Sequence, residues 1–238
     1  MCYSLLVKQD LEYLIKNFGV MPIQSEFERF LKLNETNPKK FKKLDENPRI
    51  YPGYHAPIII SEKSERLALP MRYRVRPFDS EKEVPTKYNM FNARADSLTK
   101  RRTWQNLFMR NHGVLVFERF FEWVKDKESG KKKVVSFKPE SHEAMWAPVL
   151  YDTWVPPSNN AENSALETQN AEKIVSFAVI TTDPPKEILD NGHDRSPIFL
   201  RKDLIDPWLN PQGKTPKEML SLLTNQEQTT YGCYDAVP

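Results

Sequence analysis

The spacing of apolar residues along the chain predicts three helices. Across residues 10–18 apolar side chains recur at i, i+3, i+4 and i+7, and Gly19 follows as a C-terminal stop. Over residues 24–33, Phe27, Phe30 and Leu31 fall at i, i+3 and i+4 and predict a second helix. A further helical stretch follows Pro216, with Met219 on its apolar side. Two predicted helices therefore precede the central part of the chain, and one follows it.

Five segments in the central part of the chain have the composition of β-strands. They are rich in β-branched or aromatic residues and are bounded by turn residues. The five segments are residues 56–60, 72–76, 114–121, 133–137 and 174–181. Residues 128–131 have the sequence of a hairpin tip, and the polar residues 157–172 are expected to form an exposed loop.

Helices at both ends and strands between them indicate an α+β fold. We predict a single domain over residues 1–238, with a central β-sheet or barrel-like structure and peripheral helices. A length of 238 residues allows one sizeable core, and 39% hydrophobic with 28% charged residues is typical of globular domains.

The cysteines and the N-terminal sequence bear on cofactors and location. Cys2 and Cys233 are too few and too widely spaced for a disulfide scaffold or a zinc site. The N-terminus lacks a basic region followed by a long apolar core, and no stretch approaches the roughly 18 apolar residues of a membrane span. We expect a cytoplasmic protein with free thiols, nucleoid-associated if bacterial. We also expect a monomer without metal, cofactor or membrane partner.

Cys2 becomes the N-terminal residue once Met1 is removed, which is general when the second residue is small. Removal leaves an amine and a thiol on adjacent carbons, with reference pKa values of about 7.7–8.0 and about 8.5. Some amine is therefore uncharged near neutral pH. Such a 1,2-aminothiol condenses with an aldehyde to an imine, and the sulfur then closes a five-membered thiazolidine. An internal cysteine cannot do this.

Three segments further along the sequence bear on the role of Cys2. They are residues 88–96 (YNMFNARAD), residues 114–123 (VLVFERFFEW), and residues 178–182 (AVITT) followed by residues 193–197 (HDRSP). In order and spacing, these segments and the Met-Cys start resemble the SOS-response-associated peptidase (SRAP) family, whose best-known members sense abasic sites in single-stranded DNA. The resemblance covers residues 1–210 and implies an SRAP-like fold.

The resemblance implies roles for five residues. Cys2 matches the nucleophile that removes its own methionine and then crosslinks abasic DNA. Asn92 matches an asparagine that hydrogen-bonds near the reacting sugar and the cysteine amine. Glu122 matches an acid that assists the amine and the proton transfers, and His193 matches an acid or base acting on the opened sugar. Arg94 matches an arginine that holds a DNA phosphate.

The chemistry of these residue types agrees with those roles. Opening a sugar to its aldehyde needs a proton donor and acceptor, and a histidine titrates near the working pH. Dehydrating a carbinolamine needs a second proton carrier, which a partly buried carboxylate such as Glu122 among apolar neighbours can supply. Asn92 donates and accepts hydrogen bonds without changing charge. Arg94 offers a planar fork for phosphate oxygens.

Contacts to DNA must be argued from the positions of basic residues, because the net charge is only +3. Arg72, Arg74 and Arg76 alternate along the chain, so on a strand all three would lie on one face and could follow a phosphate backbone. Thr181 and Thr182 lie where the family has backbone-contacting residues.

Three aromatic residues lie near these basic positions in the sequence: Tyr73, Phe78 and Trp104. Each is a candidate to stack on an unpaired base. Each is also a candidate for the hydrophobic core, and for any one of them the core is the preferred interpretation.

The leading hypothesis is a self-processing cysteine peptidase that crosslinks to abasic sites in single-stranded DNA and has a lyase-type activity, acting in DNA repair and the SOS response. The chain departs from the family's Met-Cys-Gly-Arg start, since Tyr3 and Ser4 replace glycine and arginine. That departure supports an alternative, a non-catalytic single-stranded DNA-binding module. A thiol peptidase acting on other proteins is a third hypothesis.

Overall fold

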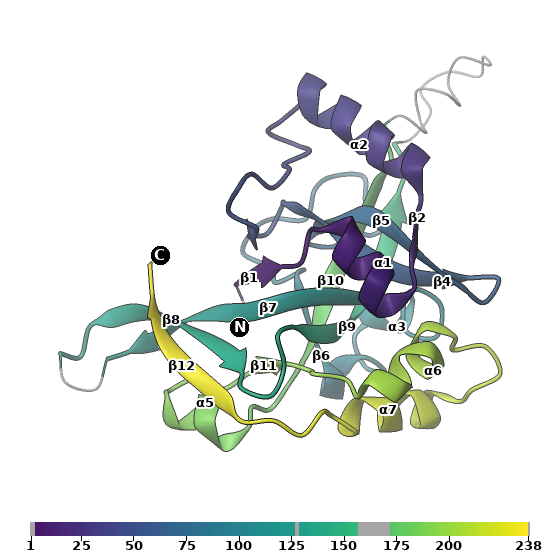
Figure 1. Cartoon of the computed structure of the whole chain (residues 1–238). Helices are drawn as coiled ribbons and strands as arrows, with labels where there is room; N and C mark the ends of the chain where they lie inside the picture. The colour runs from purple at the N-terminus through teal and green to yellow at the C-terminus, as the bar shows by residue number, and fades with distance from the viewer. Residues whose placement is uncertain (1–2, 127–128, 157–171, 238) are drawn as a thin grey trace, which may run out of the picture.

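The computed structural model describes residues 3–126, 129–156 and 172–237, and it confirms the α+β fold. Within these residues the strands form one 12-stranded sheet with helices around it (Figure 1). The strands are β1 (Ser4–Val7), β2 (Met21–Pro22), β3 (Arg49–Ile50), β4 (His55–Glu62), β5 (Glu65–Tyr73), β6 (Asn92–Arg94), β7 (His112–Lys125), β8 (Lys132–Pro139), β9 (Met145–Trp154), β10 (Ile174–Thr182), β11 (Ser196–Pro197) and β12 (Tyr231–Ala236). The α-helices are α1 (Leu11–Phe18), α2 (Gln24–Thr36), α3 (Arg102–Gln105), α5 (Lys186–Asp190), α6 (Ile205–Leu209) and α7 (Pro216–Thr224).

Five of the strands close into a ring. The antiparallel pairs are β4 with β5, β4 with β7, β7 with β9, and β9 with β10. The parallel pairing of β10 with β5 completes the circle. These strands carry fully buried side chains, among them Ile58, Phe117 and Phe177. The prediction of a barrel-like centre with peripheral helices is therefore confirmed.

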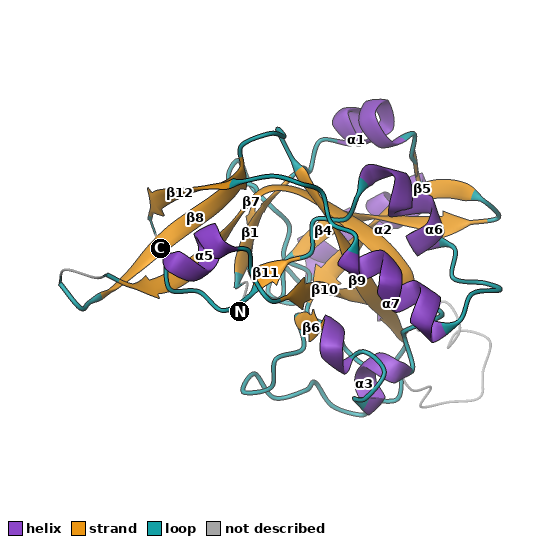
Figure 2. Cartoon of the chain, turned by 90° about the horizontal axis from the view of Figure 1, so that it is seen from below, coloured by secondary structure: helices purple, strands orange, loops and turns teal. Residues whose placement is uncertain are grey.

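The three predicted helices are confirmed, and local capping sets their ends. Helix α1 begins after Asp10, whose side chain accepts a hydrogen bond from a backbone N–H, and it stops at Gly19 with φ 62°. Helix α7 begins with a capping box in which Thr215 and Glu218 bond to each other's backbone N–H groups. The helices lie at the periphery of the sheet (Figure 2). None of the described helices is long and apolar enough to cross a membrane.

Four of the five predicted strands are confirmed, as β4, β7, β8 and β10. The predicted strand over residues 72–76 is wrong, because β5 ends at Tyr73 and Arg74 takes a φ of 117°, outside extended geometry. Strands β7 and β8 pair as a hairpin, as expected from residues 128–131, although residues 127–128 lie outside the described part of the chain. The predicted loop over residues 157–172 lies outside it too, except for its last residue.

Candidate functional site

Strand β10 brings together three segments that are far apart in the sequence. It pairs in parallel with β6, so that Val179 lies opposite Asn92 and Thr181 opposite Arg94. On its other side it pairs with β11, where Thr181 lies opposite Pro197. The chain that precedes β11 carries His193. The Asn-Ala-Arg, Thr-Thr and His-Asp-Arg segments therefore converge on one end of β10.

Strand β1 brings the start of the described chain to the same region. Ser4 pairs with Phe121, the residue immediately before Glu122 on β7. The ring of Tyr3 lies edge-on to that of Phe91, the residue before Asn92, with 6.0 Å between ring centroids. The described chain thus begins between the segments that carry Glu122 and Asn92. Cys2 itself lies outside the described residues.

Glu122 and His193 form a direct pair. Nε2 of His193 lies 2.9 Å from Oε1 of Glu122, and the two side chains are only 8% and 3% exposed. Gly192, with φ 87°, turns the chain after α5 and places His193 against the helix, where its backbone N–H bonds to Ile188. A carboxylate and an imidazole at hydrogen-bond distance can pass a proton between them, which suits acid–base chemistry.

The surroundings of Glu122 are buried, as its apolar neighbours in the sequence indicated. Phe120 is fully buried and Phe121 is nearly so. Trp123 is 49% exposed and lines a small pocket together with Glu122.

Asn92 is held by two neighbours. The hydroxyl of Tyr73 donates to its side-chain oxygen at 3.4 Å. The side chain of Asn89 accepts hydrogen bonds from the backbone N–H groups of Phe91 and Asn92, at 3.2 Å and 3.0 Å, which fixes the turn into β6. Tyr73 is fully buried, and so belongs to the core. Sequence reasoning considered it for base stacking and missed its contact with Asn92.

The other two aromatic candidates divide between surface and core. Phe78 is 59% exposed and keeps a free face for stacking, whereas Trp104 is buried. Thr181 is buried between β6 and β11, and Thr182 is half-buried and pairs with Ser196.

Arg94 lies at the surface, and its side chain is paired with an acidic residue of the same chain. Two of its guanidinium nitrogens donate to the carboxylate of Asp96, at 3.0 Å and 2.6 Å. This hydrogen bonding raises the pKa of Arg94 and lowers the pKa of Asp96, so both remain charged near neutral pH. A phosphate that bound Arg94 would compete with Asp96.

The three alternating arginines do not form an open row. The side chains of Arg72, Arg74 and Arg76 are buried, and all three contact the carboxylate of Glu83. The three side chains meet at one carboxylate although the strand ends before Arg74, and the loop that carries Glu83 returns over them. Their role in binding DNA stays a prediction.

A small pocket of about 80 Å³ opens beside Glu122, and its lining includes Tyr3, Ser4, Arg49 and Phe121. Nε of Arg49 donates to the hydroxyl of Ser4 at 3.0 Å, and its guanidinium lies 3.8 Å from the ring centroid of Phe121. Sequence reasoning missed Arg49, since the two-residue strand β3 that carries it has no periodic pattern. This places a cation within the pocket that Glu122 lines.

Two of the chain's four histidines are unsuited to proton transfer near neutral pH. Burial lowers the pKa of His55 to about 3 and that of His112 to about 4, so both remain neutral. His142 is half-buried, and among the four it is His193 that meets a buried carboxylate. Within the described residues, no group of three or more histidine, cysteine or acidic side chains could hold a metal ion.

Comparisons with known proteins agree with this geometry. The family model described as SOS response associated peptidase (SRAP) matches residues 1–237. The chain is 28% identical over 142 residues to "Abasic site processing protein YoaM" of Bacillus subtilis (strain 168), a match that covers 60% of this chain and only 56% of that relative. It is 23% identical over 223 residues to "Abasic site processing protein YoqW" of the same organism, covering 94% of this chain and 86% of the relative.

A solved structure of a protein from Bacteroides thetaiotaomicron has the same fold. Its TM-score with this chain is 0.72 at 19% identity, over 98% of this chain and 91% of that one. The match of the family model along almost the whole sequence is the decisive finding. This chain belongs to the SOS response associated peptidase family.

Proposed function

We propose that this protein processes abasic sites in DNA, and that it does so by bonding covalently through Cys2 to the aldehyde of the opened sugar in single-stranded DNA. The observation that carries the proposal is the buried pair of Glu122 and His193, 2.9 Å apart, at the point where the first described strand meets β7. In the sequence, Cys2 is followed by Tyr3, the residue immediately before that strand. Family membership and the printed names of YoaM and YoqW support the same substrate.

The first step in this proposal is self-processing. Hydrolysis of the bond between Met1 and Cys2 adds one water across the peptide and releases methionine. The step leaves a primary amine and a thiol on Cys2. It corresponds to the peptidase activity in the family's description, with the chain's own N-terminus as substrate.

The second step is condensation with the abasic sugar. The closed sugar opens to an aldehyde when its ring oxygen takes a proton and its hydroxyl loses one, and in this proposal His193 exchanges these protons. The Cys2 amine adds to the aldehyde, and the carbinolamine loses one water to give an imine, with Glu122 carrying the proton. The thiol then adds to the imine carbon, so the complete reaction joins protein and DNA with loss of one water.

The side chains around this pair would position the sugar. The amide of Asn92, oriented by Tyr73, hydrogen-bonds the sugar without changing charge. Arg94 holds the neighbouring phosphate after exchanging its bond to Asp96. The imine also acidifies the adjacent sugar carbon, and loss of that proton with departure of the 3′ phosphate would be the lyase-type reaction. We propose that a monomer performs all of these steps in the cytoplasm.

A denaturing gel tests the proposal. Purified protein incubated with a single-stranded oligonucleotide carrying one abasic site is expected to give a slower band that survives heat and detergent. The same oligonucleotide with an intact base, and one with a tetrahydrofuran analogue that cannot form an aldehyde, are expected to give none. No such band with the abasic strand, or an equal band with the analogue, would contradict it.

One observation favours a second function. Ser4, at the position of the family's arginine, is buried and bonded to Arg49, so this position offers no cation to DNA. A protein that kept the fold and lost the reaction would bind single-stranded DNA without a covalent bond. It would give a salt-sensitive complex on a native gel and no band on the denaturing gel.

A further inference from the structure

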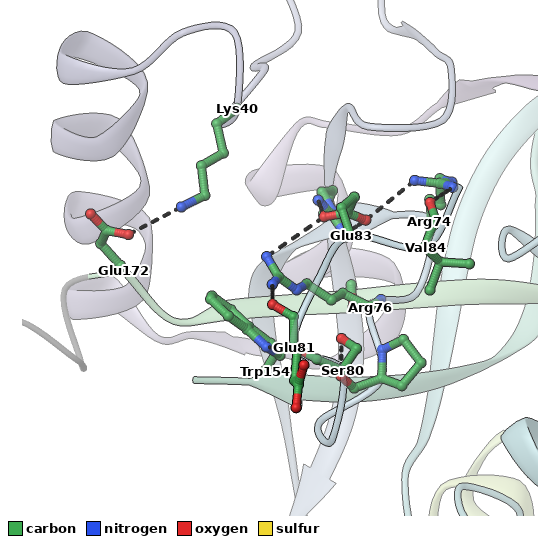
Figure 3. A network of polar contacts seen from close by, with 12 residues as sticks. Lys40, Arg74, Arg76, Ser80, Glu81, Glu83, Val84, Trp154 and Glu172 are labelled. Carbon is green, nitrogen blue, oxygen red and sulfur yellow. Dashed lines mark hydrogen bonds and ion pairs between the residues drawn. The ribbon is translucent and has the colours of Figure 1, made fainter. Parts of the chain in front are cut away.

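Three arginines at the end of β5 share one carboxylate. Arg72 donates through both terminal nitrogens to the two oxygens of Glu83, at 3.1 Å and 3.0 Å. A terminal nitrogen of Arg74 lies 3.2 Å from one oxygen, and one of Arg76 lies 3.7 Å from the other. Figure 3 shows the guanidinium groups of Arg74 and Arg76 reaching Glu83 from two sides. The three guanidinium groups thus form an anion-binding site, and the carboxylate of Glu83 occupies it.

The charges in this cluster do not balance. Three guanidinium groups meet one carboxylate, which leaves an excess of positive charge. The arginine side chains are 8–10% exposed, whereas that of Glu83 is 40% exposed. Within the described residues, Nε of Arg72 and Nε of Arg76 have no hydrogen-bond partner. Burying cations with too little counter-charge is costly, so such an arrangement needs a reason beyond stability.

The backbone at the centre of the cluster is strained as well. Arg74 has a φ of 117°, a conformation that is rare for any residue except glycine. Its guanidinium bonds to Glu83 and to the carbonyl of Val84, which holds this geometry in place. Strain of this kind is concentrated at ligand-binding and active sites.

Glu83 and the arginines are carried by different kinds of structure. Glu83 lies in the irregular, largely exposed segment of residues 77–89, which contains neither helix nor strand. Arg76 is anchored against Trp154, with its guanidinium 3.3 Å from the ring centroid. Glu83 can therefore leave the arginines more easily than the arginines can move.

We propose that Arg72, Arg74 and Arg76 form a binding site for a backbone phosphate of single-stranded DNA, and that Glu83 occupies this site until DNA displaces it. A carboxylate and a phosphate diester each carry one negative charge and two terminal oxygens, and both suit the guanidinium fork. Tyr73, the residue between Arg72 and Arg74 in the sequence, bonds to Asn92, so the same short segment carries the arginines and a contact to the proposed reaction centre. The inference rests on the proposed function for the identity of its ligand.

The test measures binding of an undamaged oligonucleotide, which has no aldehyde and cannot crosslink. A fluorescent single strand is titrated with wild type, Glu83→Gln and Glu81→Gln, and anisotropy is recorded at several salt concentrations. Glu81 is the matched control, because it lies in the same exposed segment and its backbone carbonyl, not its carboxylate, contacts Arg76. Both variants remove one negative charge.

The proposal predicts that Glu83→Gln binds about tenfold tighter than wild type, since a charge-assisted contact no longer meets an internal competitor. Its plot of log affinity against log salt is expected to be steeper by about 0.7, the slope of one further phosphate contact on a single strand. Glu81→Gln is expected to stay close to wild type in both. Equal effects of the two variants on affinity would show that any lost negative charge strengthens binding, and this would overturn the proposal. Weaker binding by Glu83→Gln than by wild type would overturn it as well.

Thermal melting keeps the inference testable if Glu83→Gln is unstable. Inorganic phosphate, compared with chloride at equal ionic strength, is expected to raise the melting temperature of Glu83→Gln more than that of Glu81→Gln. No such difference would show that Glu83 is only a structural clamp. Stabilisation by phosphate without tighter oligonucleotide binding would indicate a site for small phosphates, and would also overturn the proposal. If the abasic strand fails to crosslink but these results hold, the proposed reaction is wrong and the phosphate site stands.

Discussion

Replacing Cys2 with serine is expected to abolish the heat-resistant complex with abasic DNA. Serine is small enough for the general removal of Met1, so the variant still exposes an amine at residue 2 and an imine can form, but it has no thiol to close the thiazolidine. The imine hydrolyses in water, and the band on the denaturing gel should fall to the level of the protein-free lane. Adding borohydride during the reaction reduces the imine to a stable amine, and under that condition the band should return.

Cys233 supplies the matched control. It is exposed on β12, where it pairs with Phe137. The Cys233→Ser variant loses one thiol, as does Cys2→Ser, and is expected to give a band equal to wild type. A band that persists in Cys2→Ser without borohydride, or one lost in Cys233→Ser, would show that the bond forms elsewhere on the chain.

Replacing Glu122 with glutamine is expected to slow crosslinking by about 10²–10⁴-fold, the usual contribution of a positioned proton carrier. Glutamine keeps the size of the side chain and an oxygen that can accept from His193, but it cannot take up or release a proton. A similar loss is expected for His193→Gln, and little further loss for the double variant, because the two residues act as one unit. The measurement is a single-turnover time course on the denaturing gel.

Two controls separate proton transfer from folding and binding. His142→Gln changes a half-buried histidine outside the pair and is expected to crosslink at the wild-type rate. Affinity for the undamaged oligonucleotide should be the same for Glu122→Gln and wild type. A variant that loses affinity and rate in equal measure would show that Glu122 supports DNA binding, and the proton-transfer role would then be wrong.

Parts of the fold could be predicted because local sequence determines them. Helix α1 has a side-chain cap at Asp10 and a glycine stop, and β10 consists of β-branched and apolar residues except for Ser176. Strand β1 was missed because it has only four residues, and its partners Ile50 and Phe121 lie far along the chain. Its identity as a strand comes from those pairings, which no local pattern records.

The candidate site, too, could be predicted only in part from the sequence. Glu122 and His193 were found as members of sequence motifs, but their 2.9 Å contact depends on the pairing of β10 with β11 and on the turn at Gly192. The strand predicted across Arg72, Arg74 and Arg76 was wrong beyond Tyr73, because alternation in the sequence cannot reveal the positive φ at Arg74 or the return of Glu83.

Two steps of the proposed reaction change the mass of the product, namely the removal of Met1 and the loss of one water on condensation. The intact mass of the gel-purified complex therefore reports on both steps in a single measurement. We predict the mass of the protein without Met1 plus that of the abasic oligonucleotide, less one water, with proteolysis placing the modification on the N-terminal peptide that begins at Cys2. A complex that retains Met1, that lacks the loss of water, or that is modified on another peptide would contradict the proposed reaction.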